Sequence, residues 1–540
     1  MSQTKTLKKP AGSVAASHGD NLKWLIAVTV AMATFMEVLD DTSVSVALSQ
    51  IGGNLSAAED EVTWVVTAQL VSKAVVLPVA GFLATVVGRK RLFSICLLAY
   101  GATSLLCGLS PTIGFLVFMR VIQGLSGGML SPMAQAILTD TFPPAQRGLA
   151  FAAYGVATVV APTVGPTLGG YLVDNASWNW VFFVNVPVAI VTAFLVSILV
   201  KDPPALVKEK AAKWAGGLNV DYVGLGLLAV GLSALQYVLS RGEREEWFSS
   251  GAITVLAGVA AIALVAGVIW EWRSKDPVID LKLLKHRNFA AAVLVMFSVG
   301  AVLFSSSTQL PLFLQNLLGY TAIKSGLAIS PGGAAVLLLM PVVGVLASKV
   351  QARWMILLGL IISTFALFNY AGVLSSDIDF ASVAKARVFQ SVGLAFLFVP
   401  ISVAAYVGIA KNKTNQAATL INLAQSLGGS FGIAAITTLI ARRAQFHQSR
   451  IIDSLTFSNP NYEAGLQNLA STQAAAGGSL AEATERAQAT IYGAVQLQAN
   501  ILSYIDSFYL LGFACLLSIP LVFLMRANKP GQDGQTEAAG

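Results

Sequence analysis

Three carboxylic acids lie within one long apolar stretch near the start of the chain, and this restricts the fold more than any other feature. Glu37, Asp40 and Asp41 interrupt the apolar residues 24–48. A helix crosses a bilayer with roughly 20 residues, and each charge near its centre costs on the order of 3 kcal/mol even on lenient insertion scales. We therefore expect these acids to be paired, protonated or in contact with water, as a proton-carrying group must be.

The composition is that of an integral membrane protein, because 55% of the residues are apolar and only 11% are charged. About 14 stretches are long and apolar enough to cross a membrane as helices. The sequence therefore predicts an all-α integral membrane protein with 14 transmembrane helices. These helices are expected to begin near Trp24, Val62, Leu92, Ile113, Leu149, Trp180, Val220, Gly251, Phe289, Ile323, Trp354, Phe380, Gln416 and Ile501.

The distribution of Lys and Arg predicts the orientation. The polar residues 1–23 contain no pattern of a removable signal peptide, so the first helix is expected to anchor the chain. With the N-terminus inside, about 23 of the 34 basic residues fall on the cytoplasmic side. An even number of spans also places the C-terminus there. The net charge of +7 therefore reflects topology, and nucleic-acid binding is not expected.

An internal repeat predicts two related halves. The pattern P-V-x-G-x-L-A occurs at residues 78–84 and again at 341–347, and Arg120 and Gln123 recur as Arg387 and Gln390. The two offsets, about 263 and about 267 residues, nearly agree, and both pairs keep their direction through the membrane. Two parallel six-helix bundles are the expected arrangement.

The expected organisation has five parts. A cytoplasmic tail (1–23) precedes the N-terminal bundle (24–200). Residues 201–288 hold charged linkers and two inserted transmembrane helices, which exceed the 6 + 6 count. The C-terminal bundle (289–526) includes an extracytoplasmic loop at 442–500 that is polar and helix-like in places. Residues 527–540 form a second cytoplasmic tail.

The depths of the ionisable residues indicate two pairs. At 1.5 Å per residue, Asp40 and Arg120 lie at similar depth, and Lys73 lies near the depth of Glu37. We hypothesise that Asp40 binds a transported proton and that Arg120 modulates its affinity, because a nearby cation favours the ionised acid. The alternative is a permanent ion pair that only fixes helix packing. Lys73 either compensates the negative charge of the acids or contacts an anionic or zwitterionic substrate. These alternatives leave the charge of the substrate open.

Several polar residues are candidates for a substrate cavity. Gln123 and Gln309 are two, and repeat symmetry adds Arg387 and Gln390 in the second half. Gln69, Asn422 and Gln425 are buried polar residues that we expect to bond neighbouring helices.

Other functional classes lack their motifs in this sequence. The three cysteines fall in predicted spans and the three histidines in tails or loops, so neither a metal site nor a disulfide is predicted. No phosphate-binding loop or nucleophile elbow occurs, so ATP-driven transport, enzyme activity and a cofactor are not expected. An ion gradient is the expected energy source.

Four motifs resemble those of the fourteen-span drug:proton antiporter branch of the major facilitator superfamily, particularly the EmrB-type multidrug exporters. LDDTSVSVAL (39–48) resembles the first-helix motif LDxTVVNVALP, and RVIQG (120–124) the fourth-helix motif RxxQG. GPTLGG (165–170) is similar to the antiporter motif GPxxGG, and residues 178–187 to the start of the sixth helix. The resemblance implies the major facilitator fold, two six-helix bundles with two inserted helices.

Two of these segments are expected to shape gates. In GFLATVVGRK (81–90), which resembles GxLaDrxGRK, Gly81, Gly88 and Arg89 match, whereas Thr85 replaces the usual Asp and Val86 a basic residue. In 165–170, the small side chains let helix backbones approach, and Pro166 bends its helix. Either gating or plain packing explains this segment. Its glycines include Gly165, Gly169 and Gly170.

The resemblance implies proton-coupled export of small amphipathic compounds across the inner membrane by alternating access. It also implies a periplasmic adaptor protein, for which 442–500 is the candidate contact. Export of one specific metabolite or lipid-like molecule is an alternative. A non-transporting sensor or assembly subunit is a second.

Overall fold

The described residues of the computed structural model form helices and no strand. They comprise 20–215, 221–274, 277–456, 459–475 and 479–526. Fourteen helices in this part of the chain are long and apolar enough to cross a membrane, which confirms the predicted fold class. The tail 527–540 and most of the tail 1–23 lie outside the described residues.

Six spans form each bundle, and two more lie outside the repeats. The first bundle contains α1 (Asp20–Leu55), α2 (Glu59–Val87), α3 (Arg89–Gly108), α4 (Ile113–Gly127) with α5 (Leu130–Thr141), α6 (Pro144–Asn175), and α7 (Asn179–Phe183) with α8 (Asn185–Leu199). The second contains α12 (Arg287–Asn316), α13 (Ala322–Ala347), α14 (Ala352–Val373), α15 (Phe380–Ala405), α16 (Thr414–Ile452) and α18 (Leu480–Phe523). Between the bundles lie α9 (Pro204–Ala215), α10 (Tyr222–Arg241) and α11 (Gly251–Arg273).

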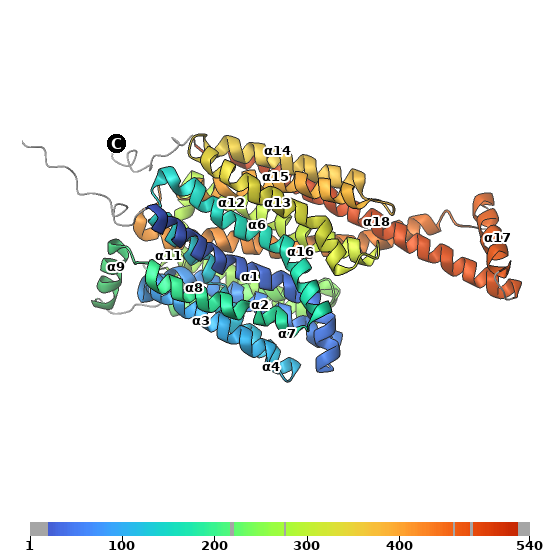
Figure 1. The fold of residues 1–540 in the computed structure, drawn as a ribbon, viewed down its shortest axis with the longest axis horizontal. Helices are drawn as coiled ribbons and strands as arrows, with labels where there is room; N and C mark the ends of the chain where they lie inside the picture. The colour runs from blue at the N-terminus through green and yellow to red at the C-terminus, as the bar shows by residue number, and fades with distance from the viewer. Residues whose placement is uncertain (1–19, 216–220, 275–276, 457–458, 476–478, 527–540) are drawn as a thin grey trace, which may run out of the picture.

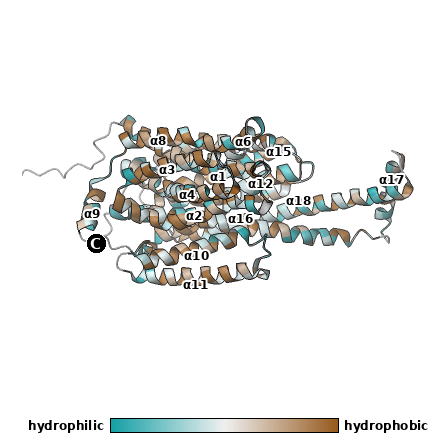
Figure 2. Cartoon of the chain, turned by 90° about the horizontal axis from the view of Figure 1, so that it is seen from below, coloured by the Kyte–Doolittle hydropathy of each residue, from teal (hydrophilic) through white to brown (hydrophobic). Residues whose placement is uncertain are grey.

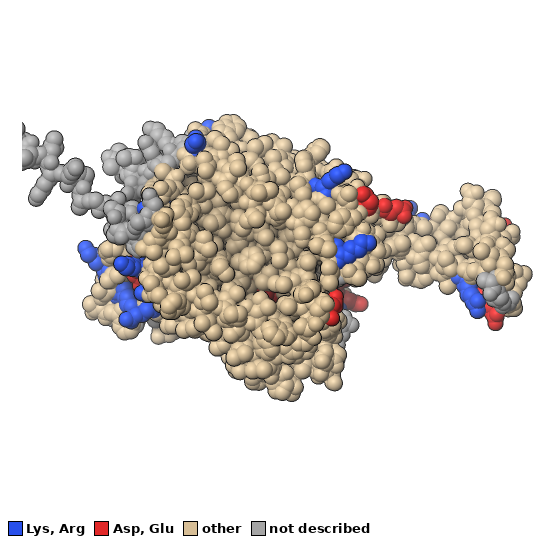
Figure 3. All heavy atoms as spheres, in the orientation of Figure 1, with Lys and Arg blue, Asp and Glu red and all other residues tan. Residues whose placement is uncertain are grey.

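The two ends of the molecule differ in shape (Figure 1). We call the end where α1 begins and α18 finishes the terminal end, and the opposite end the loop end. Charged side chains gather toward both ends of the face in Figure 3, and the wide band between them is nearly free of charge. This distribution is typical of a protein that crosses a hydrocarbon layer.

Beyond the loop end, α16 and α18 continue as a projection that also carries α17 (Pro460–Ala475) (Figures 1 and 2). The helix that contains the last span therefore begins at Leu480 with polar turns, and its apolar part begins near the predicted Ile501. Asp506 of α18 bonds Arg443 Nε at 2.5 Å and His447 Nε2 at 2.8 Å on α16. We define this projection as residues 442–500.

The α10–α11 hairpin contacts both bundles near the loop end, beside α2 and α16 (Figure 2). The Trp64 ring of α2 lies 5.6 Å from the Tyr237 ring, and the Arg241 guanidinium lies 5.1 Å from the Trp64 centroid. Trp247 Nε1, in the connection between α10 and α11, donates to Thr438 Oγ1 of α16 at 3.0 Å. Helix α10 and the connection that follows it therefore pack across the junction of the bundles, and α11 packs against α10.

The two bundles pack closely where α6 meets α13. A Cβ atom on Gly344 would lie 2.8 Å from Leu149 Cα and 2.9 Å from the Gly148 carbonyl oxygen. Small residues allow this approach, because association of helices in lipid depends on close backbone packing.

Replacing Gly344 with Val is expected to destabilise the protein by about 1–3 kcal/mol, because backbone atoms must move to admit the side chain. Gly258→Val is the matched control, since a Cβ there meets nothing within 4 Å. Thermal unfolding in detergent should show a lower midpoint for G344V and an unchanged one for G258V. Equal midpoints would contradict close packing at this junction.

Candidate substrate cavity and coupling site

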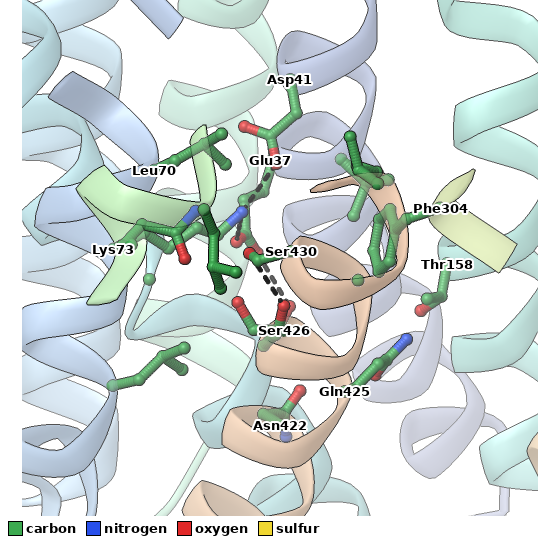
Figure 4. Close-up of a pocket in the computed structure, with 18 of the residues that line it drawn as sticks. Glu37, Asp41, Leu70, Lys73, Thr158, Phe304, Asn422, Gln425, Ser426 and Ser430 are labelled. Atoms are coloured by element: carbon green, nitrogen blue, oxygen red, sulfur yellow. Dashed lines mark hydrogen bonds and ion pairs between the residues drawn. The ribbon is translucent and has the colours of Figure 1, made fainter. Parts of the chain in front are cut away.

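A cavity of about 150 Å³ lies between the two bundles (Figure 4). Its lining comes from α1, α2, α5, α6, α10, α12 and α16, together with the break between α4 and α5. The charged residues that line it are Glu37, Asp41 and Lys73. Apolar side chains, including Leu70, Leu77, Leu239, Phe304 and Ile433, form much of the remaining wall.

The break between α4 and α5 brings Lys73 into this cavity. At Gly128 a Cβ atom would lie 2.9 Å from Lys73 Cγ and 2.8 Å from Val76 Cγ1. A larger residue would push α2 away, so the glycine permits the lysine to approach α1.

Lys73 lies between two carboxylates of α1. Its Nζ is 2.6 Å from Glu37 Oε1 and 2.7 Å from Asp41 Oδ2, and Ser131 Oγ donates to Glu37 Oε2 at 2.8 Å. When all three groups are ionised, two negative charges and one positive charge leave one negative charge. We call Glu37, Asp41 and Lys73 the cavity triad.

Asp40 points into a separate, enclosed network. Its Oδ2 lies 2.6 Å from Arg120 Nη1, and both side chains are 0% exposed. Asn185 Nδ2 donates to Asp40 Oδ1 at 2.7 Å, and Gln69 Nε2 donates to Oδ2 at 3.3 Å. Asp40 is absent from the cavity lining. The acid is therefore neutralised and hydrogen-bonded at both oxygens.

Arg120 is equally well bonded. Its Nε donates to the Val65 carbonyl at 3.0 Å, its Nη1 to Gln123 Oε1 at 2.8 Å, and its Nη2 to Gln69 Oε1. Gln123 Nε2 in turn donates to Ser104 Oγ at 2.7 Å. Asp40, Arg120 and their partners thus join α1, α2, α3, α4 and α8, and we call this set the Asp40–Arg120 network.

The second bundle repeats part of this network. Arg387 Nη1 donates to Gln390 Oε1 at 2.8 Å, as Arg120 does to Gln123, and Gln390 Nε2 donates to Ser306 Oγ at 2.8 Å. Arg387 Nη2 also bonds Ser307 Oγ at 3.1 Å and Thr163 Oγ1 at 3.4 Å, which links it to α6 of the first bundle. The hydroxyls of Ser307 and Thr163 thus bond Arg387, whereas the carboxylate of Asp40 bonds Arg120.

The cavity contains fewer of the predicted polar residues than sequence analysis expects. Lys73 lines it, whereas four others of the predicted set do not. They instead bond neighbouring helices or residues of their own helix, as Gln309 does with Thr437 Oγ1 at 3.1 Å. The residues placed outside the cavity lining are Gln123, Gln309, Arg387 and Gln390. Residues of the lining that sequence analysis missed include Ser131, Tyr154, Gln236, Ser240, Ser426 and Ser430.

The segment 81–90 joins the bundles at the terminal end. Arg89 forms an ion pair with Asp140, and its Nε donates to Asn415 Oδ1 of α16 at 2.5 Å. Asn415 Nδ2 donates to Thr85 Oγ1 at 3.3 Å, so Thr85 contributes a neutral bond to this junction. Gly88 has φ +95°, a conformation that glycine adopts readily, and it separates α2 from α3.

Two further contacts strengthen this junction. A Cβ at Gly81 would lie 2.9 Å from Thr419 Oγ1, so α2 and α16 are close there. Tyr406 OH of α15 donates to Gln135 Oε1 of α5 at 3.1 Å. We call the contacts of Thr85, Arg89 and Tyr406 with their partners the terminal-end contacts.

The segment 165–170 packs α6 against α1. Ser43 Oγ donates to the Gly165 carbonyl at 2.9 Å, and a Cβ at Gly169 would lie 2.8 Å from the Ser43 carbonyl oxygen. Pro166 and Gly170 are buried in the same helix. This contact holds two helices of one bundle together, beside the α6–α13 junction.

Two related bundles around a cavity with ionisable residues define a membrane transporter. The Major Facilitator Superfamily model matches residues 30–433, and the chain belongs to this superfamily. It is similar to the multidrug export protein EmrB of Escherichia coli (strain K12), with 33% identity over 85% of this chain and 88% of the relative. It is also 35% identical to the fatty acid resistance protein FarB of Neisseria gonorrhoeae, over 81% and 84% of the two chains.

Solved structures agree on the fold. The proton:xylose symporter XylE aligns with a TM-score of 0.63 at 11% identity, over 97% of this chain and 100% of that chain. The human organic anion transporter MFSD10 aligns with a TM-score of 0.57 at 12% identity, over 93% and 99%.

Asp40→Asn is expected to destabilise the protein by about 3–5 kcal/mol, because it leaves the Arg120 charge buried without a counter-charge. Asp41→Asn is the matched control: Lys73 keeps Glu37, and the Asp41 side chain is 19% exposed, so a loss below about 1 kcal/mol is expected. Thermal unfolding in detergent compares the two. A stable D40N that loses only proton coupling would instead identify Asp40 as the proton carrier.

Proposed function

We propose that this protein exports amphipathic compounds across the inner membrane in exchange for protons, with both termini in the cytoplasm. The observation that carries the proposal is the cavity triad, which places two acids in a cavity lined by both bundles. An ionisable group inside a membrane protein is costly and by default indicates a functional site. The similarity to EmrB, named as a multidrug export protein, supports the substrate class.

Protons and substrate compete for the cavity triad in this proposal. A proton on Glu37 or Asp41 makes the triad neutral, and its release restores a negative charge that favours substrate. A proton on Asp40 would leave Arg120 unpaired in a fully buried network, at a cost of several kcal/mol. We therefore assign Asp40 and Arg120 the alternative role of a permanent pair that fixes helix packing.

Alternating access would follow from rocking of the two bundles. The terminal-end contacts cross the junction between them, and we propose that these contacts break when the cavity opens to the cytoplasm. Two of these hydrogen bonds, Tyr406 to Gln135 and Asn415 to Thr85, join neutral groups and are individually weak, about 0.5–1.5 kcal/mol each, so they suit a contact that must open repeatedly. One charge that moves down 100 mV yields about 2.3 kcal/mol for this cycle.

The remaining assignments are also proposals. We place the bundles at 24–200 and 289–526, separated by 201–288, and a periplasmic adaptor at the projection 442–500. The projection extends beyond the bundle on α16 and α18, so it is accessible from that side (Figure 1).

Export of a lipid-like molecule is the second candidate. The similarity to a fatty acid resistance protein favours it. Broad dye efflux supports the first proposal, and transport restricted to fatty acids supports the second.

Proteoliposomes with an imposed pH gradient test the proposal. Glu37→Gln and Asp41→Asn are expected to lower proton-driven dye export at least tenfold, because each removes an acid from the exchange site. Asp377→Asn is the matched control, since Asp377 is an exposed acid whose Oδ2 accepts from Ser376 at 3.2 Å. Wild-type rates in both cavity variants would exclude the cavity triad as the coupling site, and equal flux without a pH gradient would exclude proton coupling.

A further inference from the structure

Helix α10 lies outside the repeated bundles, yet it forms part of the cavity wall. Gln236, Leu239 and Ser240 of this helix line the same cavity as the triad. A helix inserted between two bundles could lie at the periphery and face lipid on all sides. Here the contacts of Trp64 with Tyr237 and Arg241 hold α10 against α2 at the junction.

Two amides in the cavity wall have no hydrogen-bond partner among the described residues. Gln236 is 3% exposed and Gln425 of α16 is 5% exposed, and both line the cavity. An amide in a cavity wall that no protein group bonds is available to a molecule in the cavity. Each amide offers both a donor and an acceptor.

The charges indicate the kind of ligand. Lys73 is already within 2.7 Å of two carboxylates, so its charge is compensated. Asp41 Oδ1 is buried and accepts no hydrogen bond from any described residue. A cation is therefore favoured beside Asp41, whereas an anion would meet two carboxylates. Leu239, Phe304 and Ile433 provide apolar contact in the same cavity.

We propose that the cavity binds an amphipathic organic monocation, with its charge beside Asp41 and a hydrogen-bonding group on Gln236 and Gln425. Helix α10 is then part of the substrate site, and Gln236 determines specificity. This inference rests on the proposed export function and specifies its substrate class.

Equilibrium binding to the purified full chain tests this assignment with three probes of known chemistry. Ethidium is a monocation with two aromatic amines, tetraphenylphosphonium is a monocation without a hydrogen-bonding group, and tetraphenylborate is an anion of similar shape. Gln236→Ala and Gln425→Ala are each expected to weaken ethidium binding about five- to tenfold and to leave tetraphenylphosphonium binding within about twofold. Asp41→Asn should weaken both cations at least tenfold. Val230→Ala, at an exposed position of α10, is the matched control.

Retained tetraphenylphosphonium binding shows that each glutamine variant is folded. Two results would overturn the proposal: equal ethidium affinity in Q236A, Q425A and wild type, which means that water satisfies the amides, or tetraphenylborate binding as tight as that of the cations. These measurements require no proton gradient. Loss of proton-driven flux with normal cation binding would therefore contradict the coupling proposal and leave the substrate class standing.

Discussion

The Lys73 ammonium, held between Glu37 and Asp41, is the interaction on which this account depends. Three charges in a hydrocarbon layer are tolerated because they compensate one another and line a cavity. Asp40, on the same helix, is compensated by Arg120 and is fully enclosed. Helix α1 therefore directs Asp40 toward Arg120 inside its own bundle, where the two charges cancel. It directs Glu37 and Asp41 toward the cavity, where with Lys73 they form a charged group. Asp41 follows Glu37 by four positions, about one helical turn, so both acids lie on the same face.

The two bundles share a framework but differ in charge. In each, an arginine bonds a glutamine three residues later, and that glutamine bonds a serine of another helix. The first bundle adds Asp40, whereas in the second Arg387 bonds Ser307 and also Thr163 of the first bundle. The acids that can take part in exchange thus belong to the first bundle. The second contributes neutral polar residues such as Asn422 and Gln425 to the cavity.

The depth of each ionisable residue along the membrane normal could be predicted from the sequence. The direction in which a side chain points around its helix could not. Counting 1.5 Å per residue places Asp40 level with Arg120 and Lys73 level with Glu37, and both pairs are in contact in the structure. The same counting cannot show that Gln123 turns toward Ser104 and away from the cavity. The contribution of α10 to the cavity lining could not be predicted either, because a helix outside the repeat has no counterpart in the other bundle from which its position could be inferred. The bond between Asn415 and Thr85, the residue that replaces the usual Asp of the 81–90 motif, could not be predicted without knowing that α2 and α16 meet.

The most direct measurement is the number of protons released when a cation binds. Purified protein in a weakly buffered detergent solution with a pH indicator dye would be mixed with tetraphenylphosphonium, over a series of starting pH values. The account predicts release approaching one proton per bound cation at the acidic end of the series, and none from a Glu37→Gln, Asp41→Asn double variant. Cation binding without proton release at any pH, or equal release from the double variant, would contradict the claim that proton and substrate share the cavity triad.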